Sequence, residues 1–158
     1  MKRADFLRKL HDEGKLKEVD PSAEIAEAYL QKSDKSLVSA KALLDIGNLE
    51  DSVAMAYYAM YHCLIALLFR TGIKCENHSA AIILLQEVFG IDNSQISKAK
   101  SERVDKQYYV DFSISKNETG DAILAAEEFK ANLKDFIDRL NSEKIREYHN
   151  TAVRIISA

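Results

Sequence analysis

The run AYYAMYHCLIALLF, from Ala56 to Phe69, constrains the fold of this chain more than any other part of its sequence. A helix that is apolar nearly all round has to be surrounded by other helices. The apolar stretch from Val53 to Phe69 has 17 residues, whereas a membrane-spanning helix needs about 20. We therefore expect a buried core helix over about 49–71 in a soluble, all-helical domain, with no membrane association.

The rest of the chain predicts helices that pack around this core helix. Asp20 and Pro21 are expected to begin the first long helix, as N-cap and first helical residue. Residues 116–120 are expected to form a loop, and no stretch alternates with period two long enough to predict a strand. Apolar periodicity and stop signals place the other helices at about 3–12, 21–46, 77–89, 92–111, 122–140 and 143–156.

Short turns between these helices predict an all-α fold, an antiparallel up-and-down bundle of about five main helices. We divide the chain into a short N-terminal helix and connector (1–20), the bundle (21–141) and a C-terminal helical extension (142–158).

Composition narrows the function without identifying it. A net charge of −3 with 30% charged residues gives no bulk sign of affinity for nucleic acid, so any such affinity has to come from a local patch. Cys63 and Cys75 form neither a disulfide framework nor a metal-ligand spacing, which favours a reduced, cytoplasmic setting. The four histidines do not pair at metal-ligand spacing either, so we expect no metal and no cofactor.

The core helix carries the first group of candidate functional residues. Tyr58 and His62 share one helical face, and Tyr57 and Tyr61 share the neighbouring face. A buried polar group without a partner costs about 1–3 kcal/mol. Two interpretations stay open: a satisfied network that fixes the register of the core, or a polar pocket of Tyr58, His62 and His78 that meets a ligand or the polar groups of another helix.

The second group lies in the segment QISKAKSERVDKQYYV, residues 95–110. Basic side chains beside aromatic rings can hold phosphates and stack bases, although a solvated helix face would have the same composition. The candidate residues for nucleotide or RNA binding are Lys100, Arg103, Lys106, Tyr108 and Tyr109.

Several segments together resemble a known family. They are KSLVSAKALLDIGNLEDSV, YYAMYHCLIALLF, Gly72, NHSAAIILLQEVFG, SERVDKQYY and AILAAEEFKANLKDFIDRL. Their succession over roughly residues 22–141 resembles the HEPN family, the higher-eukaryote and prokaryote nucleotide-binding domains. The resemblance implies an antiparallel helical bundle that is often a homodimer. It also implies one of three functions: metal-independent RNA cleavage, pairing with a small nucleotidyltransferase in a toxin–antitoxin system, or binding alone.

The ribonucleases of that family use an arginine followed, after four to six residues, by a histidine. No arginine–histidine pair in this chain has that spacing, and the position that matches the histidine after Arg103 is Tyr108. A tyrosine has a pKa near 10 and is a poor base at neutral pH.

Three hypotheses follow from these observations. The favoured one is a non-catalytic HEPN-type module that binds nucleotides, nucleic acid or protein, as a homodimer and with RNA, a nucleotide or a nucleotidyltransferase as partner. The second is a metal-independent ribonuclease with an atypical site, in which Arg103 meets His78 or His62 in three dimensions. The third is a structural or small-ligand bundle.

Overall fold

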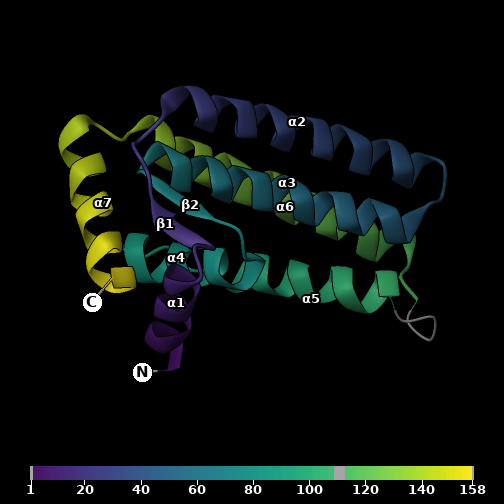
Figure 1. The fold of residues 1–158 in the computed structure, drawn as a ribbon. Coiled ribbons are helices and arrows are strands. Elements are labelled where there is room, and N and C mark those ends of the chain that lie inside the picture. The colour runs from purple at the N-terminus through teal and green to yellow at the C-terminus, as the bar shows by residue number, and fades with distance from the viewer. Residues whose placement is uncertain (1, 109–112, 158) are drawn as a thin grey trace.

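A computed structural model of the chain describes the backbone of residues 2–108 and 113–157, and their side chains except those of residues 104–108. Most of this part of the chain is helical, and the predicted all-α bundle is confirmed (Figure 1). The elements in chain order are α1 (Lys2–Asp12), β1 (Leu16–Glu18), α2 (Ala23–Asp45), α3 (Leu49–Arg70), β2 (Ile73–Cys75), α4 (His78–Phe89), α5 (Ser94–Tyr108), α6 (Lys116–Asp138) and α7 (Ser142–Ser157).

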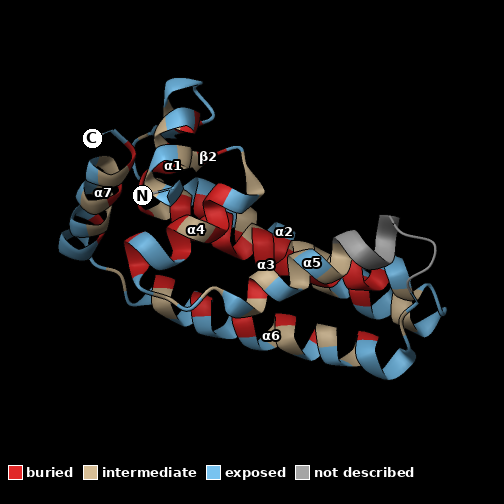
Figure 2. Cartoon of the chain, turned by 90° about the horizontal axis from the view of Figure 1, so that it is seen from below, coloured by how far each residue is buried: buried red, intermediate tan, exposed pale blue. Residues whose placement is uncertain are grey.

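The helix α3 is the centre of the bundle, as its sequence predicts. It packs against α2, α6, α5 and α4, and Figure 2 shows buried residues along its length. By length and composition α3 would pass for a membrane span, but 78% of its most apolar window is buried inside the protein. Its apolar surface therefore packs against the other helices of the bundle.

Two buried serines join α2 to α3. The hydroxyl of Ser33 donates to the carbonyl oxygen of Ala59 at 2.6 Å, and the hydroxyl of Ser52 donates to that of Ala40 at 2.6 Å. Both alanines are fully buried, and their small side chains allow the two backbones to approach. These two polar positions are thus contacts between the helices.

Two predictions about where helices begin are wrong. The N-cap of α2 is Ser22, whose hydroxyl accepts a hydrogen bond from the backbone N–H of Ile25 at 3.0 Å, and Pro21 precedes the helix. Residues 116–120 are helical, because Ser115 and Glu118 form a capping box that begins α6 at Lys116. In such a box each side chain satisfies a backbone N–H at the helix end.

The two strands were not predicted, because three residues are too few to show an alternating pattern. They pair antiparallel, with Leu16 opposite Cys75, Lys17 opposite Lys74 and Glu18 opposite Ile73. The pairing ties the N-terminal segment to the connection between α3 and α4.

The helix α7 reaches the same end of the bundle (Figure 1). There a ring nitrogen of His149, Nδ1, lies 2.9 Å from the carbonyl oxygen of Thr71, and Gly72 accepts a hydrogen bond from the N–H of Val19 at 2.9 Å. Both contacts meet the turn that follows α3, so this turn joins the N-terminal segment, the core helix and α7.

Candidate functional site

The candidate site lies where α3, α4 and α5 meet. We use the term Arg103 cluster for five side chains: Tyr57, Tyr58 and His62 from α3, His78 from α4 and Arg103 from α5. The α3 residues occupy two adjacent helical faces. His78 is the first residue of α4, and Asn77 fixes that position by accepting a hydrogen bond from the N–H of Ala80 at 2.9 Å.

Arg103 is held against two tyrosines. Its Nη1 donates to the hydroxyl of Tyr58 at 3.1 Å. Its guanidinium carbon lies 5.2 Å from the ring centre of Tyr57 and 5.5 Å from that of Tyr58. A guanidinium at this distance from an aromatic ring is stabilised by a cation–π interaction. The contacts keep a permanent positive charge in one place on the surface of α3.

His78 is held by two tyrosines of α3. Its Nδ1 shares a hydrogen bond of 2.7 Å with the hydroxyl of Tyr57, and its ring stacks on Tyr61 with 3.8 Å between ring centres. Burial raises the pKa of Tyr57 above its ordinary value, so the phenol keeps its proton. Burial, and then the charges of Arg103 and Lys100, lower the pKa of His78. His78 is therefore a neutral imidazole beside two cations at neutral pH.

His62 is the second imidazole of the cluster. Its ring lies 6.0 Å from the ring of Tyr58 and 6.0 Å from that of Tyr29. Burial, followed by the charge of Lys32, lowers its pKa. Its Nδ1 is buried and has no hydrogen-bond partner among the described residues. An unpaired polar atom that is buried in this way costs free energy.

The structure brings together residues from both predicted groups. Tyr58, His62 and His78 from the polar-pocket group lie beside Arg103 from the basic segment. Lys100 is half-buried, and its charge acts on His78. The other candidates of the basic segment, the side chains of Lys106 and Tyr108 and all of Tyr109, lie outside the described residues.

Four residues that complete this surface were left out of the polar pocket expected from the sequence. Tyr57 and Tyr61 hold His78, and Tyr29 and Lys32 flank His62. The spacing of Tyr57 and Tyr61 by one helical turn was a signal for their shared role. Tyr29 and Lys32 gave none, because they lie on α2 and their position depends on how α2 packs against α3.

The arrangement can bind an anion and can accept a proton. Arg103 offers planar donors that match two phosphate oxygens, and both imidazoles are held neutral by burial. Among the described side chains, no group of three His, Cys, Asp or Glu residues is placed to hold a metal ion.

Comparison with known proteins gives the family of the chain. The family model of the HEPN domain matches residues 26–136. The chain belongs to the HEPN family. The matched range contains every residue of the Arg103 cluster, together with α3, α4 and α5. This membership accounts for the helical bundle and for the way its helices surround α3.

Two archaeal relatives of this HEPN protein carry the name UPF0332 protein. The one from Archaeoglobus fulgidus is 28% identical over 119 residues, which cover 72% of this chain and 95% of the relative. The one from Pyrococcus horikoshii is 41% identical over 59 residues, which cover 37% of this chain and 42% of the relative. The chain thus matches less than half of the Pyrococcus protein.

The lowered pKa of both imidazoles predicts how stability depends on pH. In the unfolded chain a histidine titrates near 6.5, whereas in the folded protein the pKa of His62 and of His78 lies lower. Below about pH 6.5 the unfolded state therefore binds more protons than the folded state. The free energy of unfolding consequently decreases as the pH is lowered. Urea unfolding at about pH 7.5 and about pH 5.5 should show a lower midpoint at the acidic pH. The double variant with His62→Gln and His78→Gln should lose less stability than the wild type when the pH is lowered between these two values. A loss equal to that of the wild type would contradict the prediction.

Proposed function

We propose that this HEPN protein is a non-catalytic module that binds the phosphates of RNA or of nucleotides at the Arg103 cluster. The observation that supports this most is the fixed position of Arg103. Its guanidinium donates to the hydroxyl of Tyr58 and lies near the rings of Tyr57 and Tyr58. A guanidinium that is already held loses little conformational freedom when it binds phosphate. Lys100 adds a second positive charge beside His78.

The aromatic residues suit a single-stranded ligand. Proteins that bind single strands combine cations that follow the backbone with rings on which bases stack. Tyr58 is half-buried and lies between Arg103 and His62. The position of Tyr108 in place of the family's histidine favours binding without cleavage.

The test is a titration of a short, fluorescently labelled single-stranded RNA with the whole protein, followed by anisotropy at several salt concentrations. We expect binding at low salt that weakens as salt rises, because the cations displace counterions from the phosphates. An absence of binding at the lowest salt would overturn the proposal and favour the structural or small-ligand bundle.

One observation favours metal-independent RNA cleavage as a second candidate. Arg103 and His78 are far from the family spacing in sequence, yet both contact Tyr57. The neutral His78 would take the proton of a ribose 2′-hydroxyl. The 2′-oxygen would then bond to phosphorus while the bond to the 5′-oxygen breaks, with water supplying the proton for that oxygen. Arg103 would neutralise the charge on the phosphate, and the products would be a cyclic phosphate and a 5′-hydroxyl.

Cleavage by this route should persist in a metal chelator and be lost in His78→Ala. Gel analysis of labelled RNA checks both, with His11→Ala, which replaces a histidine of α1, as the control. Loss of a general base typically costs about 10²- to 10⁴-fold in rate. Cleavage that survives in His78→Ala at the wild-type rate would contradict this role, and no cleavage by the wild type would leave binding as the function.

We also propose a homodimer, in the cytoplasm, with a nucleotidyltransferase as a further partner. Large apolar side chains are exposed on α2 and α6, where Val38 is 68% and Leu124 is 64% exposed. Burying such side chains against a second copy would remove apolar surface from water. Light scattering should give twice the chain mass, and Val38→Asp with Leu124→Asp should give the monomer. A monomeric wild type at high concentration would refute the dimer.

A further inference from the structure

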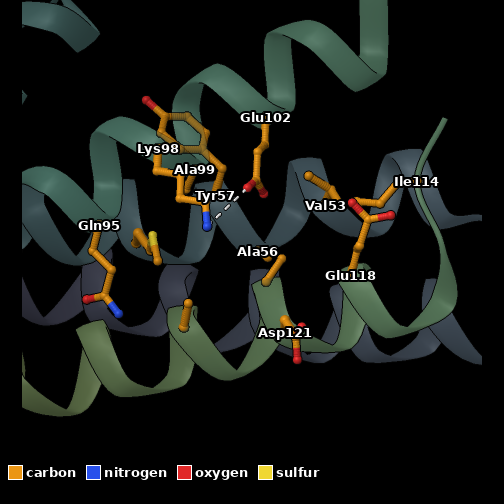
Figure 3. Close-up of a pocket in the computed structure, with 13 residues that line it drawn as sticks. Val53, Ala56, Tyr57, Gln95, Lys98, Ala99, Glu102, Ile114, Glu118 and Asp121 are labelled. Atoms are coloured by element: carbon orange, nitrogen blue, oxygen red, sulfur yellow. Dashed lines mark ion pairs between the residues drawn. The ribbon is translucent and has the colours of Figure 1, made fainter. Parts of the chain in front are cut away.

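A pocket of about 510 Å³ lies beside the Arg103 cluster, between α3, α5 and α6 (Figure 3). Its volume falls within the range of about 300–1,000 Å³ that small-molecule sites occupy. The apolar residues that line it are mostly small: Val53, Ala56, Met60, Ala99, Ile114, Ala122 and Ala125. A flat apolar ring would find space and dispersion contacts on such walls.

The pocket and the Arg103 cluster share Tyr57. Tyr57 lines the pocket, and the guanidinium carbon of Arg103 lies 5.2 Å from its ring centre. On α5, the lining residues Lys98, Ala99 and Glu102 lie on one side of the helix. Arg103 follows one residue further on, toward the side that faces His78. A ligand that fills the pocket would therefore have its other end within reach of Arg103.

The polar residues at the edge of the pocket are mainly acidic. Glu102 comes from α5, and Glu118 and Asp121 come from α6, on the other side of the pocket (Figure 3). Lys98 is the one cation among the described residues that line the pocket, and its Nζ lies 3.8 Å from a carboxylate oxygen of Glu102. Carboxylates repel a phosphate and accept hydrogen bonds from N–H groups. The charge of the pocket is thus complementary to the base of a nucleotide, and the charge of Arg103 to its phosphate.

We propose that this pocket binds the base of the nucleotide whose phosphate Arg103 holds, and that it selects guanine. The proposal rests on the function proposed above. Guanine carries an N–H and an adjacent NH₂ on one edge, which match the two oxygens of a carboxylate. Uracil carries a single N–H between two carbonyl oxygens, which a carboxylate repels. Glu102 is the specificity-determining residue, because it extends from α5 next to Arg103.

The test is calorimetric titration of the whole protein with three probes: guanosine, inosine and uridine monophosphate. Inosine monophosphate is guanosine monophosphate without the NH₂ group. A matched pair of hydrogen bonds to a base edge discriminates by about tenfold or more. We expect guanosine monophosphate to bind about tenfold more tightly than uridine monophosphate, with inosine monophosphate between them.

Three variants separate the pocket from the phosphate site. In Glu102→Gln the preference for guanosine over uridine monophosphate should disappear, because the neutral amide no longer matches the two donors of guanine and no longer repels the carbonyl oxygens of uracil. In Ala122→Phe the pocket is filled, so guanosine monophosphate should lose its advantage at an unchanged melting temperature. Arg103→Ala should weaken all three ligands by the same factor. Glu27→Gln, which removes an exposed carboxylate on α2, is the control and should match the wild type.

The outcomes distinguish the two proposals. Equal affinities for the three nucleotides in the wild type, with a loss in Arg103→Ala, would overturn the base pocket and leave the phosphate site standing. A guanosine preference that survives in Glu102→Gln and in Ala122→Phe would also overturn the pocket. An Arg103→Ala variant that binds every nucleotide as the wild type does would overturn the proposed function itself.

Discussion

Replacing Arg103 by alanine is expected to weaken RNA binding by about 10- to 100-fold. A hydrogen bond to a charged group contributes about 1.5–3 kcal/mol, and each 1.4 kcal/mol is a factor of about ten in affinity. Tyr57 and Tyr58 hold the guanidinium in place, so it can bind a phosphate without first changing its conformation. The variant loses this donor group. Fluorescence anisotropy with labelled single-stranded RNA at low salt measures the change, and the salt dependence should become shallower.

Two further variants distinguish a specific role of Arg103 from an effect of net charge. Arg139→Ala removes the same charge from the end of α6, where Arg139 pairs with Asp135 at 3.1 Å, and should bind RNA as the wild type does. Arg103→Lys keeps the charge without the planar fork, and its affinity should lie between those of wild type and Arg103→Ala. If Arg103→Ala and Arg139→Ala lose affinity equally, the effect is one of net charge, and the Arg103 cluster is not the binding site.

Replacing Gly72 by alanine is expected to lower the free energy of unfolding by about 2–5 kcal/mol. Gly72 has a φ of +83°, which a residue with a side chain rarely adopts. A Cβ atom at this position would lie 2.6 Å from the carbonyl oxygen of Val19 and 2.6 Å from Nδ1 of His149. The first cost is conformational, about 1–2 kcal/mol, and the second is steric, about 1–3 kcal/mol. Urea unfolding followed by circular dichroism measures their sum.

Gly14→Ala separates the two costs. Gly14 has a φ of +76°, but an added Cβ atom would meet nothing within 4 Å. This variant should therefore lose only the conformational part, about 1–2 kcal/mol. Equal losses in Gly14→Ala and Gly72→Ala would mean that the N-terminal segment and α7 move away from the turn at little cost.

The core helix and several helix ends could be predicted because their signals are local. The apolar run of α3 requires burial wherever the other helices lie. The expected helix at about 77–89 agrees with α4, because its N-cap Asn77 and its left-handed C-cap Gly90 act within one helical turn. The capping box of Ser115 and Glu118 was also visible as the pattern S-x-x-E, and overlooking it made residues 116–120 a loop.

The start of α2 depends on a contact between distant segments. Asp20 and Pro21 have the local properties of a helix start. In the structure Ser22 is the N-cap, and its backbone N–H donates to the carbonyl oxygen of Phe69 at 2.9 Å. That bond ties the beginning of α2 to the last turn of α3, and no pattern near Pro21 reveals it. The two strands escape prediction because each has only three residues, too few to show an alternating pattern.

In the candidate site, too, local features could be predicted from the sequence and contacts between distant segments could not. Spacing put Tyr58 and His62 on one face of α3, and charge next to tyrosines drew attention to Arg103. Sequence alone could not join the two groups, because Tyr58 and Arg103 are 45 residues apart. It also could not show that His78 reaches Tyr57. The separation between Arg103 and a histidine along the chain therefore says little about their separation in space.

The pairing of β1 with β2 joins a segment outside the range that the family model matches to a segment inside it. A fragment cut to the matched range of the family, residues 26–136, would lack β1, α1 and α7. It would leave Ile73 and Cys75 without the strand that covers them, three residues before the first residue of α4, which is His78. The range that the family model matches thus omits β1, and the pairing of β1 with β2 supports the segment that leads into His78.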